Sequence, residues 1–276
     1  MRYLDQFHYQ ITGNREGHKL VFLHGLMGSA ANWRRIATAF EDQFQVLAFD
    51  QRGHGRSFQP PDGYHPRDYA QDLARILDDL CWQQVALVGH SMGGRNALEF
   101  ALHFAQRVKC LVIEDIGPEA SVEAMLRIER LLEAVPTPFV SRQEMRRFFE
   151  EEYPHRIAWY PQPQVVSRFL QANIEQKSDS TQDWRFSKPG ILKSLREGRK
   201  EDRWDALANL HMPVLIVRGE SSRDLERQTF ERMKKTLPTA QAVEIPGAGH
   251  WVHFDQPEAF IQALKGFFHR VLGTNL

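Results

Sequence analysis

The stretch Gly89-His90-Ser91-Met92-Gly93-Gly94, GHSMGG at residues 89–94, decides the fold. It follows the apolar run QVALVGH (84–90) and opens a helical pattern over 92–104. A G-x-S-x-G sequence between a strand and a helix is typical of a sharp turn that exposes a nucleophilic serine. Such a turn needs small residues beside the serine, and glycines supply them. We therefore predict Ser91 as a nucleophile, against the alternative of a glycine-rich turn with an incidental serine.

Short apolar runs rich in β-forming residues recur on both sides of this turn. They alternate with helical patterns, which favours an α/β fold with a mostly parallel sheet flanked by helices. Near-continuous apolar strands are typical of a sheet that is buried on both faces. The predicted strands are 19–25, 44–50, 84–90, 108–116, 213–219 and 240–247, and the predicted helices are 68–81, 92–104, 224–237 and 256–272.

The alternation stops once, between Pro118 and Asp205. Charged and aromatic helical stretches fill this part of the chain, at 119–134, 141–152, 162–176 and 188–198. We interpret residues 118–205 as an inserted helical cap, and residues 1–117 together with 206–276 as the core.

Composition limits the function. Among the 276 residues, Lys and Arg together number 35 and Asp and Glu together also number 35, so the formal net charge is zero. This charge predicts neither a nucleic-acid nor a membrane partner. No apolar run approaches the ~18 residues that span a bilayer, and the start of the chain does not read as a signal peptide. The two cysteines, Cys81 and Cys110, are expected to be isolated buried thiols. We expect a cytoplasmic protein.

A serine hydroxyl needs a base to take its proton. His250 lies on the glycine-rich stretch PGAGHWVHF (246–254), between the last predicted strand and the last predicted helix. This position brings it to the same sheet edge as Ser91. His253 is the second candidate. The histidines, cysteines and acids show no spacing typical of a zinc site, so neither a metal nor a cofactor is predicted.

Four motifs together resemble the α/β-hydrolase superfamily, in the order that the superfamily shows. They are HGLMGS (24–29), DQRGHGRS (50–57), GHSMGG (89–94) and GAGHW (247–251). The resemblance implies an oxyanion hole formed by two backbone N–H groups, those of Leu26 and Met92. Such donors stabilise the tetrahedral intermediate of acyl transfer.

The acid that should orient the histidine is not where most members of the superfamily carry it. The expected G-x-x-D reads Gly219-Glu220-Ser221-Ser222. Glu114 and Asp115 follow the strand beside that of Ser91, where an acid can reach the histidine, and alternation lets only one of them serve. We choose Asp115. YbfF-type esterases and their mitochondrial relatives, which the chain resembles, also place the acid there.

Two other acids, Glu220 and Asp224, stay open as alternatives to Asp115, and Ser222 is expected to be replaceable by alanine with almost no effect. The leading hypothesis is a serine hydrolase that cleaves carboxylic esters or acyl thioesters, acting as a monomer or homodimer on a small molecule. The alternatives are a lactonase, an amidase or a C–C hydrolase, or a slow receptor on the same scaffold. Candidates for the substrate pocket are Phe139, Trp159, Tyr160, Trp184 and Trp251.

Overall fold

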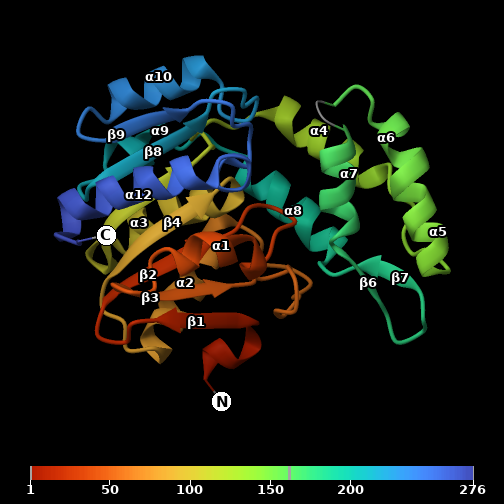
Figure 1. Cartoon of the computed structure of the whole chain (residues 1–276), viewed down its shortest axis with the longest axis horizontal. Coiled ribbons are helices and arrows are strands. Elements are labelled where there is room, and N and C mark those ends of the chain that lie inside the picture. The colour runs from red at the N-terminus through yellow and green to blue at the C-terminus, as the bar shows by residue number, and fades with distance from the viewer. Residues whose placement is uncertain (1, 161–162, 276) are drawn as a thin grey trace.

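A seven-stranded sheet forms the centre of the protein in the computed structural model, which describes residues 2–160 and 163–275 (Figure 1). The strand order is β1-β3-β2-β4-β5-β8-β9, and all neighbours are parallel except β1 and β3. The strands are β1 (Tyr9–Gly13), β2 (His18–Leu23), β3 (Phe44–Phe49), β4 (Val85–His90), β5 (Val108–Glu114), β8 (Val214–Gly219) and β9 (Gln241–Ile245). The six predicted strands are confirmed; the edge strand β1 was not predicted.

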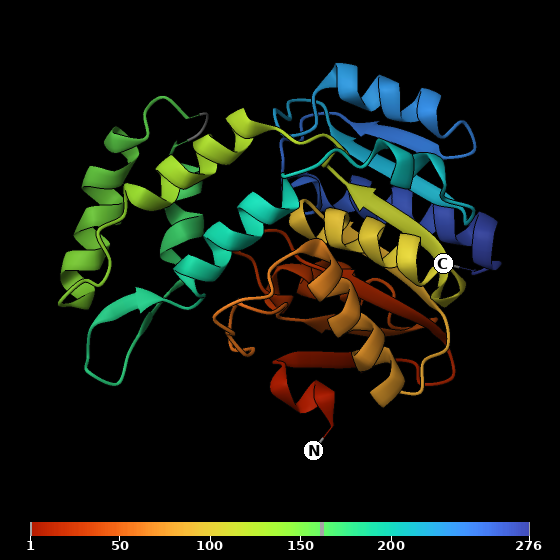
Figure 2. The ribbon, with the colours of Figure 1, turned by 180° about the vertical axis from the view of Figure 1, so that it is seen from behind.

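Helices cover both faces of this sheet, as Figures 1 and 2 show from opposite sides. Side chains along each strand alternate between two apolar clusters, so Leu20 and Phe22 pack on one face and Val21 and Leu23 on the other. This explains why the strands read as nearly continuous apolar runs. The covering helices are α1 (Arg34–Thr38), α2 (Pro66–Asp79), α3 (Met92–His103), α9 (Trp204–Ala208), α10 (Arg227–Thr236) and α12 (Pro257–Leu272).

The turn between β4 and α3 is as tight as the sequence predicts. Ser91 has φ 53° and ψ −118°, a backbone conformation that residues other than glycine rarely adopt. A Cβ on Gly89 would lie 2.3 Å from the carbonyl oxygen of Gly93. The Ser91 N–H donates to the Glu114 carbonyl over 3.0 Å, which ties the turn to the end of β5. The serine is therefore held above the middle of the sheet.

The segment between β5 and α9 lies to one side of the sheet, beyond the ends of the parallel strands (Figure 1). Its apolar side chains form a separate cluster around Leu132, Phe149 and Tyr153. The fit is tightest at Tyr64 of the core, because a Cβ on Gly190 would lie 2.4 Å from its ring. The elements are α4 (Val122–Glu133), α5 (Arg142–Arg147), the π-helix η4 (Phe148–Glu152), α6 (Tyr153–Arg156), α7 (Pro163–Gln171), the hairpin β6 (Ile174–Gln176) and β7 (Gln182–Trp184), and α8 (Lys188–Gly198).

We call this segment the cap; its boundaries at 118 and 205 stay a prediction. Gln162, the first residue of the predicted helix 162–176, lies outside the described residues, and the end of that range forms β6 instead. Cys110 is buried as expected, but Cys81 is exposed because it follows the end of α2 in a left-handed conformation with φ 55°. No helix in the described part of the chain is both long and apolar enough to cross a membrane.

The crowding at Gly89 gives a test of the turn. Gly89→Ala should lower the free energy of unfolding by about 2 kcal/mol or more, because the new methyl group meets backbone atoms that cannot yield. Gly198→Ala is the matched control, since a Cβ there meets no atom within 4 Å. Urea unfolding measures both variants. Equal stability of Gly89→Ala and Gly198→Ala would contradict the close approach.

Candidate active site

Three side chains from separate strand ends meet above the sheet. Ser91 follows β4, Asp115 follows β5, and His250 follows the loop after β9. The His250 ring lies between the other two, with Nε2 3.0 Å from the Ser91 Oγ and Nδ1 2.8 Å from the Asp115 Oδ2. The structure thus brings the three predicted catalytic residues into one hydrogen-bonded chain. Their catalytic roles stay a prediction.

The Asp115 carboxylate is completely buried, and both of its oxygens accept hydrogen bonds. Besides the His250 ring, it accepts the Gly219 N–H over 2.8 Å and the hydroxyl of Ser222. Burial raises the pKa of Asp115, whereas the bonds from His250, Ser222 and Gly219 stabilise its charged form. Ser222 therefore has a role that our sequence analysis did not foresee, and its removal would leave a buried acceptor with one donor fewer.

Asp224, which was open as an alternative acid, also lies beside the histidine. Its Oδ2 is 3.7 Å from the His250 Nδ1, and its Oδ1 is paired at 2.7 Å with Arg127 of α4. Burial lowers the pKa of His250, but the charges of Asp224, Asp115 and Glu114 outweigh burial and raise this pKa to about 9. The other alternative, Glu220, instead accepts the Gly247 N–H at 2.9 Å.

A second buried group lies directly beneath the His250 ring. Glu114, the last residue of β5, accepts hydrogen bonds from the backbone N–H of His253 at 2.9 Å and from its ring Nδ1 at 2.8 Å, whereas Asp115 contacts His250. His90 donates from Nε2 to the His250 carbonyl over 2.8 Å, and Trp33 stacks on His253 at 4.4 Å. The potential ligand atoms of His90, Glu114 and His253 lie within 4.8 Å of one another. The bonds between Glu114 and His253 occupy the second candidate base, and the bond from His90 holds the backbone of His250 in place.

Two backbone amides beside Ser91 have no acceptor. Among the residues that the structure describes, the N–H groups of Leu26 and Met92 donate to no protein atom. Met92 follows Ser91 directly, and the loop that carries Leu26 packs on the serine, because a Cβ on Gly25 would lie 3.2 Å from the Ser91 Cβ. Free donors at this position suit a developing oxyanion, in agreement with the predicted roles.

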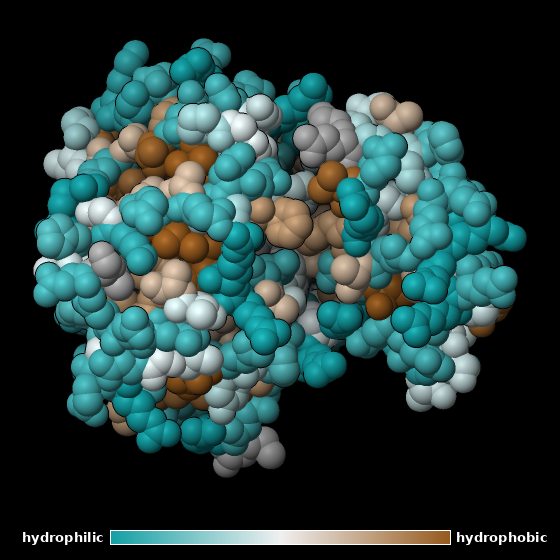
Figure 3. All heavy atoms as spheres, in the orientation of Figure 1, coloured by the Kyte–Doolittle hydropathy of each residue, from teal (hydrophilic) through white to brown (hydrophobic). Residues whose placement is uncertain are grey.

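The cavity over Ser91 is small and mostly apolar, about 50 Å³ in volume. Of the predicted pocket residues, Tyr160 and Trp251 line it, and Trp159 lines a larger cavity outside. Phe139 and Trp184 do not reach either cavity; they are buried in the apolar cluster of the cap, because their rings hold its helices together. The other apolar walls come from Leu26, Met27, Ile128, Leu131, Val166, Phe169 and Leu170, and the polar walls from His90, Ser91, Asp224 and His250. Figure 3 shows apolar side chains gathered where cap and core meet.

Comparisons with known proteins agree with this geometry. A sequence profile of the alpha/beta hydrolase fold matches residues 19–257. The chain belongs to the alpha/beta hydrolase family. With hydrolases among its relatives, the protein is a hydrolase.

Among the relatives of this hydrolase is a 2-(acetamidomethylene)succinate hydrolase from Mesorhizobium japonicum, 30% identical over 251 residues, covering 91% of this chain and 88% of that protein. An sn-1-specific diacylglycerol lipase, ABHD11 of Danio rerio, is 29% identical over 260 residues, with 92% and 80% covered. The solved structure of an esterase from a marine microorganism superposes with a TM-score of 0.81 at 30% identity, covering 95% of this chain and 99% of that one.

The carboxylates around His250 make its pKa testable. Because the negative charge of Asp224 favours the imidazolium, Asp224→Asn should lower the pKa of His250 from about 9 toward the ordinary value. A titration followed by the NMR signals of the imidazole measures it. Asp62→Asn is the control, since Asp62 is exposed and pairs with Lys193. An unchanged pKa in Asp224→Asn would show that Asp224 does not act on the ring.

The same charge gives a stability test. The folded pKa of about 9 lies above the unfolded value of about 6.5, so His250 contributes stability that is complete below about pH 6.5 and is lost as the pH rises through 9. Asp224→Asn should weaken this dependence in urea unfolding between these two pH values.

Proposed function

We propose that the hydrolase cleaves carboxylic esters or acyl thioesters through an acyl-enzyme on Ser91. The observation that carries this proposal is the continuous chain from the Ser91 Oγ through the His250 ring to the buried Asp115 carboxylate, with links of 3.0 and 2.8 Å. A base within hydrogen-bond reach of the hydroxyl, itself oriented by an acid, is the arrangement that activates a serine.

The reaction follows from these contacts. The Ser91 Oγ attacks the substrate carbonyl while the Nε2 of neutral His250, the form that predominates above its pKa of about 9, takes the proton, and the carbonyl electrons move to the oxygen that faces the amides of Leu26 and Met92. The tetrahedral intermediate collapses, the alcohol or thiol leaves with the proton from His250, and an ester to Ser91 remains. Water then attacks this ester with His250 as the base, which releases the acid and restores the serine. Asp115 stays charged and holds the imidazolium.

The cavity supports a short apolar acyl group. A volume of about 50 Å³ has room for a few water molecules or a similarly small group. Its walls are mostly aliphatic and aromatic, so they favour a hydrocarbon chain. The functions of an esterase and a lipase among the similar proteins support ester cleavage as well. Hydrolysis of a bond other than an ester or thioester is the second candidate function, because the relative from Mesorhizobium japonicum is named for the hydrolysis of 2-(acetamidomethylene)succinate.

Ser91 should be the covalent nucleophile. The protein should react with a fluorophosphonate probe and show a burst of 4-nitrophenol with 4-nitrophenyl acetate, since the first step forms an acyl-enzyme. Ser91→Ala should abolish both signals. Ser167→Ala is the matched control, because Ser167 is buried in the cap, where it donates to the Phe149 carbonyl, and does not line the cavity over Ser91. Absence of labelling in the native protein would favour a receptor.

Asp115 should be the orienting acid. Asp115→Asn should lower the kcat for 4-nitrophenyl butyrate by ~10⁴ without unfolding the protein, because the amide would favour the wrong imidazole tautomer. Glu220→Gln, the same type of change in a neighbouring loop, should leave the kcat within about twofold. Steady-state kinetics measures both, and circular dichroism confirms the fold. Near-normal turnover in Asp115→Asn would mean that Asp224 or another acid serves instead.

A further inference from the structure

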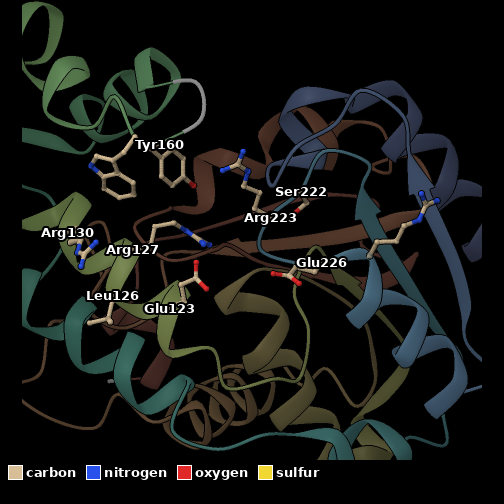
Figure 4. Close-up of a pocket in the computed structure, with 10 residues that line it drawn as sticks. Glu123, Leu126, Arg127, Arg130, Tyr160, Ser222, Arg223 and Glu226 are labelled. Carbon is tan, nitrogen blue, oxygen red and sulfur yellow. The ribbon is translucent and has the colours of Figure 1, made fainter.

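Two adjoining cavities lie outside the apolar cavity, between cap helix α4 and the loop at residues 222–227. The outer one measures about 540 Å³ and the inner one about 70 Å³. Figure 4 shows the outer cavity, with Arg127 and Arg130 on α4 and Arg223 on the facing loop. Both cavities share part of their walls, namely Glu123, Arg127, Arg223 and Glu226. We call the two together the arginine pocket.

Positive charge exceeds negative charge in this pocket. Six arginines and four acids line it, which gives a net charge of +2; they are Arg95, Arg127, Arg130, Arg199, Arg223 and Arg227, and Glu119, Glu123, Asp224 and Glu226. Arg127 is paired with Asp224, and Arg227 is paired with Glu244 at 3.0 Å. Within the described part of the chain, the side chains of Arg130 and Arg223 form no ion pair and no hydrogen bond. The guanidinium groups of Arg130, on α4, and Arg223, on the facing loop, are thus available to bind a ligand.

The inner cavity ends on a buried arginine. Arg95 is only 7% exposed, and it donates to the carbonyls of Gly198 and Glu119. Its Nε is buried and has no partner among the described residues. Burial, with the nearby charges of Arg199 and Arg203, lowers the pKa of Arg95 to about 9. A buried guanidinium with an unused donor, close to other cations, is the environment that an anion stabilises.

The arginine pocket adjoins the reaction centre. Tyr160 lines both the outer cavity and the cavity over Ser91. Ser222 lines the outer cavity and donates to Asp115. Asp224 lines the inner cavity and approaches His250. The shared lining residues make the cavities neighbours, so an anion held in the arginine pocket would lie beside the reaction centre.

We propose that the arginine pocket binds an anionic group, a carboxylate or a phosphate, on the alcohol or thiol part of the substrate. The inference rests on the proposed ester hydrolysis. The mostly apolar walls over Ser91 carry no lysine or arginine and include the carboxylate of Asp224, so the acyl part is the uncharged one and the anion belongs to the leaving group. Arginine favours both oxyanions because its planar fork binds two oxygens at once.

Matched pairs of oxygen esters test this assignment and distinguish the two anions. The phosphate pair is 1-butyrylglycerol 3-phosphate and 1-butyrylglycerol. The carboxylate pair is O-butyryl-3-hydroxypropionate and its amide. Butyrate release gives kcat/KM for each ester, and we expect the anionic member of at least one pair to be favoured by about tenfold or more.

Variants connect the preference to the pocket. Arg130→Glu and Arg223→Glu should each reduce the anionic-to-neutral ratio of kcat/KM by about tenfold. Arg146→Glu, an exposed arginine on α5 that lines neither cavity, makes the same charge change and should leave the ratio intact.

The outcomes separate this inference from the proposed function. Ratios near one in both pairs, or a preference that survives Arg130→Glu and Arg223→Glu, would overturn the inference while the ester chemistry stands. An equal loss in Arg146→Glu would also overturn it, because the preference would then come from the overall charge. No hydrolysis of any ester, 4-nitrophenyl butyrate included, would instead reject the proposed function.

Discussion

The site depends on one buried carboxylate. Asp115 accepts hydrogen bonds from the His250 ring, the Gly219 N–H and the Ser222 hydroxyl, which belong to different segments of the chain. A buried acceptor without these donors would destabilise the fold, so the contacts that stabilise the core also fix the imidazole. The same strand end binds the turn of Ser91 through the Glu114 carbonyl. The contacts that stabilise the core and those that position Ser91 and His250 are therefore largely the same.

Much of the fold and the centre of the site could be predicted from the sequence. Buried strands and the glycine-rich turn leave local patterns, so β4, α3 and Ser91 were located closely. The edge strand β1 was missed because it is partly exposed and lacks an apolar run. The contact of Ser222 with Asp115 joins residues 107 positions apart, and no local pattern reports such a contact. The assignment of Phe139 to the pocket was wrong for another reason. An aromatic side chain in a helical insertion can pack in the apolar cluster of the cap or line the substrate cavity, and the local sequence does not distinguish the two.

Charge is distributed unevenly around the reaction centre. Three carboxylates, Asp115, Asp224 and Glu114, surround the His250 ring, whereas arginines dominate the adjoining cavities. The acids stabilise the protonated imidazole, and in the proposed binding of an anionic substrate the arginines would offset the repulsion from the acids. Arg127 links the two sets, since its guanidinium pairs with Asp224. A neutral overall composition thus conceals a strongly polarised site.

The ion pair of Arg127 and Asp224 joins the cap to the core, because Arg127 lies on a cap helix and Asp224 on the loop after β8. Arg127 offsets part of the negative charge of Asp224, which is the charge that most raises the pKa of His250. The affinity of a core histidine for its proton is therefore set in part by a side chain of the cap, so a substitution on one side of the molecule would be felt at an imidazole on the other.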